Sequence, residues 1–161
     1  MNIFYLHQNP QKCAQYHNDR HCVKMILETA QIASTTHHAL DSHESWMYRP
    51  THINHPCCVW ARETGGNYIW LTHLGIELCE EYSKRYDKTH KTTEIMLGLL
   101  DNIPPKLQNS IDDFTPVAQA MPEQYRNENP IKAYRDYYIG DKQHIAQWKT
   151  KRPYWYKANL A

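Results

Sequence analysis

The chain has 161 residues, the length of one typical domain, and is long enough to bury a single substantial core. Its formal net charge is +1 with 22% charged residues, so bulk charge neither indicates nor excludes a polyanionic partner. Tyr (12), His (11) and Trp (5) far outnumber Phe (2), and such amphipathic side chains suit either a surface that stacks on planar ligands or a hydrated core.

Apolar residues recur at helical steps along most of the chain, which predicts an all-α fold. We expect a compact single-domain bundle of three to four main helices over residues 1–161, with long irregular connections and an aromatic C-terminal tail. Residues 1–8 are apolar and short, and we expect them to form a strand or an extended arm that ends at Asn9-Pro10. The first long helix is expected from residue 10 or 12 to about residue 38.

The rest of the chain alternates helical patterns with loops. Residues 41–54 break any period and are expected to form a loop of functional size. Pro56 suits the first position of the helix that follows, and Gly65-Gly66 interrupts or kinks that helix. We expect further helices over residues 57–64, 67–86 and 87–100 and from Pro130 or Ile131 to Trp148, with a proline-rich irregular connection over 101–129.

Five polar side chains follow one another at helical spacing in the first long helix: His17, His21, Lys24, Glu28 and Gln31. Steps of four, three, four and three keep side chains on one helix face. Because His21, Lys24 and Glu28 can converge on one small volume, we interpret this face as the active site. The alternative is a solvated polar face with a Lys–Glu pair that contributes only about 0.2–0.5 kcal/mol.

A second polar group precedes the helix that Pro56 opens. Asn54 and His55 lead directly into the helix N-terminus, and Arg62 follows one turn later. The N-terminus of a helix is a natural place for an anion such as a phosphate. The alternative is that Asn54 only caps the helix and that His55 is an ordinary loop residue.

The tail combines cations with aromatic rings. Arg152 and Lys157 flank Trp155 and Tyr156. Such a mixture matches the binding of single strands or extruded bases. The alternative is that these rings pack on the core.

The five cysteines form no CxxC pair, and we expect reduced thiols in a cytosolic-type compartment. The N-terminus lacks a basic segment and no stretch approaches 18 apolar residues, so we expect neither a signal peptide nor a membrane span. His17 and His21 have zinc-ligand spacing, with His52 or His55 as a third candidate, but Asn18 stands where an HExxH motif has Glu. We therefore expect no metal, no cofactor and a cytoplasmic location, the host cytoplasm if the protein is phage-encoded.

Four features together resemble one family. The first long helix carries His21 and, seven residues later, Glu28, and the central helix ends Leu78-Cys-Glu-Glu-Tyr-Ser-Lys-Arg-Tyr86. The segment Met121-Pro-Glu-Gln-Tyr-Arg126 is like Ile-Pro-Gln-Glu-Phe-Arg, and Arg152-Pro-Tyr-Trp-Tyr-Lys157 is close to Arg-Pro-Thr-Trp-Tyr-Lys. These segments resemble the phage pyrimidine-dimer DNA glycosylase/AP-lyase family (T4 endonuclease V-like), a family of small all-α repair enzymes.

The resemblance implies that an N-terminal amine is the nucleophile. It attacks the sugar C1′, releases the base and forms a Schiff base that leads to strand cleavage, while a helix carboxylate, here Glu28, stabilises the sugar cation. α-Amines titrate near pH 8, so a neutral fraction is present at physiological pH. In the family the initiator Met is removed to expose Thr, whereas residue 2 here is Asn. Either the amine of Met1 serves, or the chain is processed otherwise, or this chemistry is absent.

The leading hypothesis is therefore a DNA glycosylase/AP-lyase-like enzyme that acts on damaged or modified bases of duplex DNA. Its catalytic residues would be Met1, Glu28, His21 and Lys24, with Lys24 as a rival amine if it is buried near His21. One alternative is an enzyme that hydrolyses or modifies a nucleotide or hypermodified base with the same His-Lys-Glu face. Another is a non-catalytic module that binds nucleic acid or a partner protein. The oligomeric state is not indicated.

Overall fold

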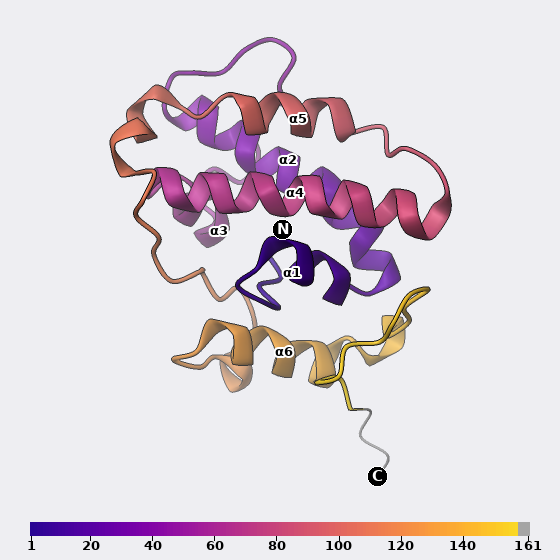
Figure 1. Ribbon diagram of the computed structural model, residues 1–161. Coiled ribbons are helices and arrows are strands. Elements are labelled where there is room, and N and C mark those ends of the chain that lie inside the picture. Colours follow the sequence, from indigo (N-terminus) through magenta and orange to yellow (C-terminus); the bar gives the residue numbers. More distant parts are fainter. Residues whose placement is uncertain (158–161) are drawn as a thin grey trace.

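Two long helices form the centre of the molecule in this computed structural model, in which residues 1–157 are described (Figure 1). Helices α2 (Asp19–Ala39) and α4 (Gly65–Tyr86) pack against each other, and α5 contacts both of them. The other α-helices are α1 (Pro10–Tyr16), α3 (Pro56–Ala61), α5 (Thr93–Asp101) and α6 (Pro130–Asp141), with short 3-10 helices at Pro105–Ser110, Glu123–Tyr125 and Gln143–Ile145. No strand occurs within residues 1–157, and the predicted all-α bundle is confirmed.

The expectation of one continuous helix over residues 10–38 is wrong, because the chain breaks at His17 and Asn18. His17 follows α1 in an extended conformation, and Asn18 is the N-cap of α2. The Asn18 side chain accepts a hydrogen bond of 2.9 Å from the backbone N–H of His21. Such a cap satisfies one of the N–H groups that a helix start leaves unpaired, so the break is stable.

The region around residues 55–66 also differs from the expectation. Pro56 does open α3, but the cap is His55, whose Nδ1 accepts from the N–H of Cys57, and not Asn54. Gly65 does not interrupt a helix; it begins α4 after the N-cap Thr64. A Cβ at Gly65 would lie 2.4 Å from the Leu107 carbonyl oxygen, so close backbone approach explains this glycine.

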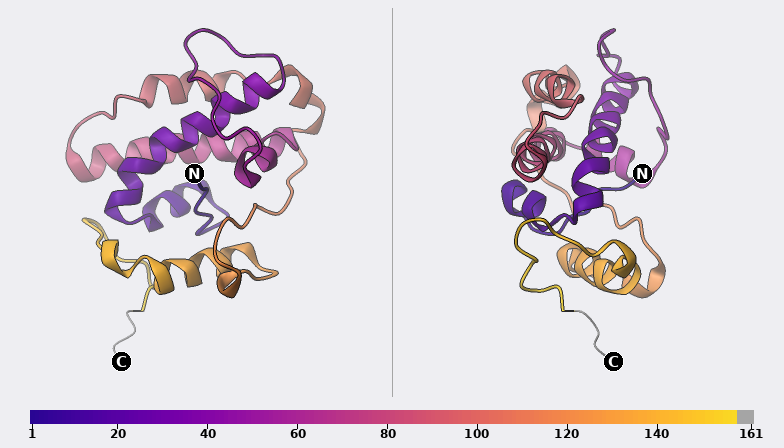
Figure 2. Two further views of the ribbon diagram at one scale, coloured as in Figure 1. Left: turned by 180° about the vertical axis from the view of Figure 1, so that it is seen from behind. Right: turned by 90° about the vertical axis from the view of Figure 1, so that its right-hand side faces the viewer.

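The C-terminal half is less helical than predicted. Helix α5 begins at Thr93 and α6 ends at Asp141, several residues short of Trp148. Helix α6 lies below α1 as a separate layer, and the tail runs back across it (Figures 1 and 2). The first residues form the expected extended arm rather than a strand.

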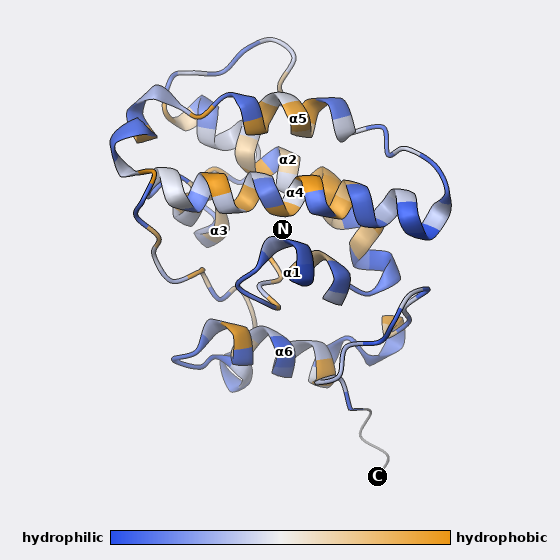
Figure 3. Cartoon of the chain, in the orientation of Figure 1, coloured by the Kyte–Doolittle hydropathy of each residue, from blue (hydrophilic) through white to orange (hydrophobic). Residues whose placement is uncertain are grey.

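The core uses aromatic rings whose polar ends are paired. Tyr68, Tyr134 and Tyr138 are fully buried, and the Tyr68 hydroxyl donates to the carbonyl of Leu99 at 2.7 Å. Figure 3 accordingly shows short hydrophobic bands on α4 and α5 between polar positions, not a continuous apolar face. All five cysteines are free and buried. Within residues 1–157, no helix has the length and hydropathy needed to cross a membrane.

Candidate active site

The amino terminus lies beside the carboxylate of Glu28 on α2. The nitrogen of Met1 is 3.4 Å from Oε1, and only 4% and 13% of the two side chains are exposed. The arm that follows is buried, and Asn2 fixes it by donating to the carbonyl of Ala120 at 2.9 Å and accepting from the hydroxyl of Tyr134 at 2.9 Å. The arm and α2 therefore hold an amine and a carboxylate at a defined separation.

The second oxygen of Glu28 is not satisfied. Oε2 is buried and has no hydrogen-bond partner among the described residues. Its nearest cation is the Nζ of Lys24 at 3.7 Å. The Lys24 side chain is 73% exposed, so the burial near His21 that would make it a rival amine does not occur. A buried acceptor without a donor costs free energy that a bound ligand can relieve.

His21 is held against α6 and the N-terminal arm. Its Nδ1 lies 2.6 Å from the hydroxyl of Tyr138, and its ring stacks on Phe4 with centroids 4.1 Å apart. Burial, together with nearby cations such as Lys142, lowers the pKa of His21 to about 2. Burial also raises the pKa of Tyr138 well above its ordinary value. The imidazole is therefore neutral at physiological pH, and the phenol keeps its proton.

A pocket of about 270 Å³ opens at these groups. It adjoins a second, shallower pocket that shares Met1, Lys24 and Glu28 with it. The four catalytic candidates Met1, His21, Lys24 and Glu28 line the first pocket together with His55, while Gln31 and His52 line the second. The structure therefore brings together residues from the N-terminal arm, α2 and the loop before α3.

Sequence reasoning named Met1 of the arm but missed Phe4 and the contributions of the chain around α6. Phe4, Tyr137 and Lys142 also line the pocket. The Nζ of Lys142 lies 4.9 Å from the ring centroid of Tyr137 and 5.9 Å from that of Phe4. No local signal marks these residues, because only long-range packing places α6 against residue 21.

Three of the residues expected to bind nucleic acid lie inside the protein. His17 has no exposed surface, and its Nδ1 lies 2.7 Å from the carbonyl of Cys13, so it does not reach a ligand. Tyr156 is 4% exposed and packs against Trp148, and Trp155 is half-buried against Tyr16. These positions are corrections to the sequence-based interpretation, because packing uses the same rings that stacking would require.

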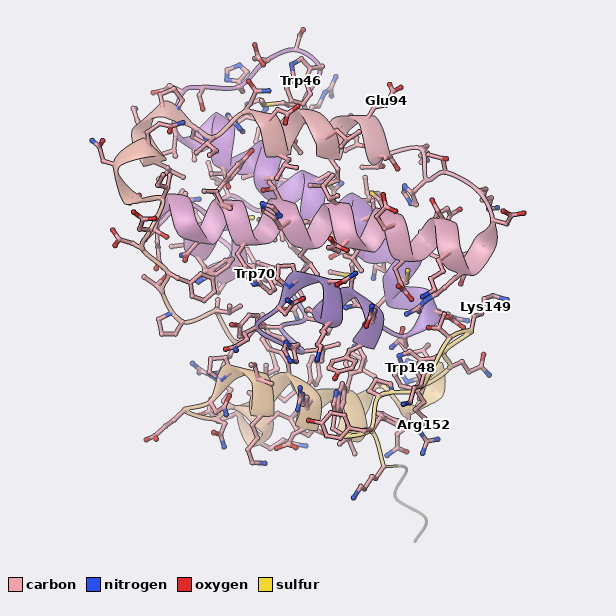
Figure 4. The ribbon with its side chains drawn as sticks, in the orientation of Figure 1. Trp46, Trp70, Glu94, Trp148, Lys149 and Arg152 are labelled. Carbon is pink, nitrogen blue, oxygen red and sulfur yellow. The ribbon has the colours of Figure 1, made fainter. Side chains whose placement is uncertain are left out.

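The remaining candidates lie at the surface. Asn54 is exposed beside His55, and Arg62 donates from Nη1 to the carbonyl of Ile53 at 2.6 Å, which ties down this loop. Arg152 and Lys157 are exposed on the tail. Figure 4 shows Arg152 near Trp148 and Lys149, below α1 and to the right of α6.

The family comparison covers the part of the chain that carries the four catalytic candidates. A family model described as pyrimidine dimer DNA glycosylase matches residues 1–94, which include the arm, α2 and Glu28 but not α6. No curated protein and no solved structure matched the chain.

Proposed function

The chain belongs to the pyrimidine dimer DNA glycosylase family, and we propose that it excises a damaged or modified base from DNA and then cleaves the strand as a lyase. The observation that supports this proposal most directly is the distance of 3.4 Å between the nitrogen of Met1 and Oε1 of Glu28. Nucleophilic catalysis needs an amine with a neighbouring group that accepts its proton, and the pair has this arrangement.

In the proposed first step the neutral amine of residue 1 attacks C1′ of the target sugar. The new N–C1′ bond forms while the glycosidic bond breaks, and the base leaves with the bonding electron pair and takes up a proton. The carboxylate of Glu28 offsets the positive charge that develops on the sugar and then accepts a proton from the attached nitrogen. Its unsatisfied Oε2 is available for this transfer.

The second step opens the sugar ring: the C1′–O4′ bond breaks, O4′ takes the proton that Glu28 holds, and a Schiff base forms between the amine and C1′. Removal of a proton from C2′ then expels the 3′ phosphate, which breaks the strand. Among residues 1–157, Glu28 is the only carboxylate that lines the pocket, so we assign the removal of the C2′ proton to it as well. The target base or its partner leaves the stack to give access to the sugar.

The cations around the pocket would hold the DNA backbone. Lys24 is exposed beside Glu28, and Lys142 reaches the opposite wall from the segment after α6. Because His21 is neutral, it serves as a hydrogen-bonding group: if Tyr138 donates to Nδ1, then Nε2 carries the proton and can donate to the substrate. We propose further DNA contacts for Gln31, Asn54, His55 and Arg62, which lie in or beside the two pockets.

Borohydride trapping on duplex DNA with one abasic site tests the proposal, because borohydride reduces a Schiff base to a stable amine. We expect a covalent adduct of one protein molecule with the abasic strand. If no adduct forms on undamaged, abasic or modified DNA, the lyase assignment fails. The nucleotide-level enzyme or the binding module then remains, and affinity for mononucleotides without affinity for duplex DNA would favour the former.

A further inference from the structure

We propose that the C-terminal tail forms a second binding site, separate from the Met1–Glu28 pocket, that takes a single nucleotide unit by its phosphate and its base. The tail folds over the end of α1 and the C-terminal part of α4 and encloses a pocket of about 270 Å³. The size is near the lower end of small-molecule sites, which suits one nucleotide rather than a duplex. The inference does not depend on the chemistry proposed for residue 1.

Three cations line this pocket without an acidic partner. Lys84 comes from α4, and Lys151 and Arg152 come from the tail. None of the three takes part in an ion pair found among residues 1–157. Converging like charges raise the potential of a cleft and attract an anion. The structure therefore favours a phosphate at this position.

Arg152 is already oriented for such a contact. Its Nε donates to the carbonyl of Tyr156 at 3.1 Å, and its guanidinium lies 5.4 Å from the centroid of the Tyr156 ring. These contacts fix one edge of the guanidinium and leave its other N–H groups for the pocket. A fixed guanidinium loses little freedom when it binds a phosphate with two parallel hydrogen bonds.

Two tyrosine rings supply a surface for the base. Tyr16 and Tyr154 both line the pocket, and the guanidinium of Arg135 lies 5.6 Å and 5.8 Å from their ring centroids. Tyr154 is 71% exposed although its neighbours Pro153 and Tyr156 are buried. A ring that is held by a cation and open to solvent can stack on any base.

The acidic residue of the pocket is outnumbered by the three cations and is itself paired with a buried arginine. Glu81 is 6% exposed and accepts from the Nε of Arg85 at 3.0 Å and from the hydroxyl of Thr150 at 3.4 Å. The Arg85 side chain is fully buried and shares its positive charge between Glu81 and Asp19. Glu81 therefore connects α4 to the tail and lines the pocket between them.

The tail pocket shares no residue with the two pockets around Met1 and Glu28. In the right-hand view of Figure 2, the N-terminus and the tail lie on opposite sides of the molecule. The ligand is therefore not the nucleotide whose base would be excised. It is either a free nucleotide or the end of a separate strand, and both present the same phosphate and base.

Calorimetric titration with thymidine 5′-monophosphate tests the proposal on the full chain. We expect saturable binding that weakens at least tenfold in the double variant Lys84→Ala/Lys151→Ala and several-fold in Tyr154→Ala. The control Lys12→Ala/Lys88→Ala removes the same charge from exposed positions outside the pocket and should change the affinity less than twofold. Circular dichroism of each variant confirms that the fold is intact.

Further titrations identify the source of the ligand. Tighter binding of a short single-stranded oligonucleotide, weakened by the same variants, indicates a strand end, and tighter binding of the mononucleotide indicates a free nucleotide. Glu28→Gln should leave the affinity for thymidine 5′-monophosphate unchanged, which separates this site from the Met1–Glu28 pocket. The proposal is overturned if wild-type protein binds neither ligand, if thymidine without phosphate binds equally well, or if the control variant loses as much affinity.

Discussion

The amino nitrogen of Met1 lies 3.4 Å from Oε1 of Glu28, so the first residue of the chain meets the middle of α2. The relationship depends on the buried arm, in which Ile3 and Leu6 are almost without exposed surface. Burial of these apolar side chains holds the arm against the rest of the fold and so places the amine beside the carboxylate. A pair placed in this way can be altered chemically while the fold survives.

The first prediction follows from that separation. Glu28→Gln keeps the shape of the side chain but removes its capacity to accept a proton. We expect the rate of adduct formation on abasic DNA to fall by about 100-fold or more, while thermal unfolding shifts by no more than a few degrees. Glu77→Gln on α4 makes the same chemical change away from the pocket and should alter neither quantity. If stability collapses and activity per folded molecule survives, Glu28 is structural.

The sequence placed His21, Lys24 and Glu28 on one helix face, and the structure brings all three to one pocket. His21, Lys24 and Glu28 lie within one helix, where spacing alone decides which side chains share a face. His17 continued the same spacing, but Asn18 can either continue a helix or cap one, and local pattern does not decide between the two. The helix break buries His17, so this member of the predicted face was wrong.

The contributions of the C-terminal half were not predictable in the same way. Lys142 reaches the pocket because α6 packs under the N-terminal arm, a contact between segments far apart in the chain. In the tail, which has no regular secondary structure at residues 154–156, Tyr154 is exposed, Trp155 is half-buried and Tyr156 is buried. Composition identified the aromatic cluster there, whereas only packing distinguishes the exposed ring of Tyr154 from the buried ring of Tyr156.

The second prediction uses that distinction. Tyr156→Ala removes a buried ring that packs on Trp148, and we expect a loss of about 3–5 kcal/mol in the free energy of unfolding. Tyr154→Ala removes an exposed ring and should change the free energy of unfolding by no more than about 0.5 kcal/mol. Urea unfolding of both variants measures the difference. Equal effects would show that the tail is not packed as described.

The third prediction concerns Arg85, whose side chain is fully buried at the junction of α4 with the start of α2. Its guanidinium bonds Glu81 at 3.0 Å, Asp19 at 3.1 Å and the carbonyl of His17 at 2.8 Å. Arg85→Met leaves the buried carboxylate of Glu81 without its partner, and we expect about 3–5 kcal/mol of destabilisation.

The double variant Arg85→Met/Glu81→Leu provides the control for that prediction. It removes the charges of Arg85 and Glu81, so only the partly exposed carboxylate of Asp19 is left without its partner, and part of the lost stability should return. Urea unfolding of the single and double variants measures the recovery. A double variant less stable than the single one would show that the cost comes from lost packing rather than from the unpaired charge.

The fourth prediction is a dependence of stability on pH. Burial lowers the pKa of His17 from 6.5 to about 4. A base with a depressed pKa binds fewer protons in the folded state than in the unfolded state. The free energy of unfolding is therefore highest above pH 6.5 and decreases as the pH falls towards 4. His17 alone should lower the free energy of unfolding by about 3 kcal/mol between pH 7 and pH 4. His21 lowers it further.

Urea unfolding at intervals between pH 7 and pH 4.5 measures that slope, and NMR follows the imidazoles directly. The ring resonances of His17 and His21 should not titrate between pH 8 and pH 5 in the folded protein. A free energy of unfolding that is constant or increases towards pH 4.5 would contradict the burial of these neutral rings.

The last prediction separates the two amines that lie near Glu28. The side chain of Met1 is buried and its amine lies 3.4 Å from Oε1, while the Nζ of Lys24 is 3.7 Å from Oε2 and its side chain is 73% exposed. Peptide mapping of the borohydride adduct should place it on the N-terminal peptide, and a mass spectrum of the intact chain identifies which residue carries the amine. Selective acetylation of the α-amine should abolish trapping, because an amide nitrogen has no available lone pair. Lys24→Ala should weaken DNA binding but retain the adduct. Loss of the adduct in Lys24→Ala, with acetylation harmless, would move the nucleophile from the terminus to the helix, where Glu28 would still be its proton acceptor.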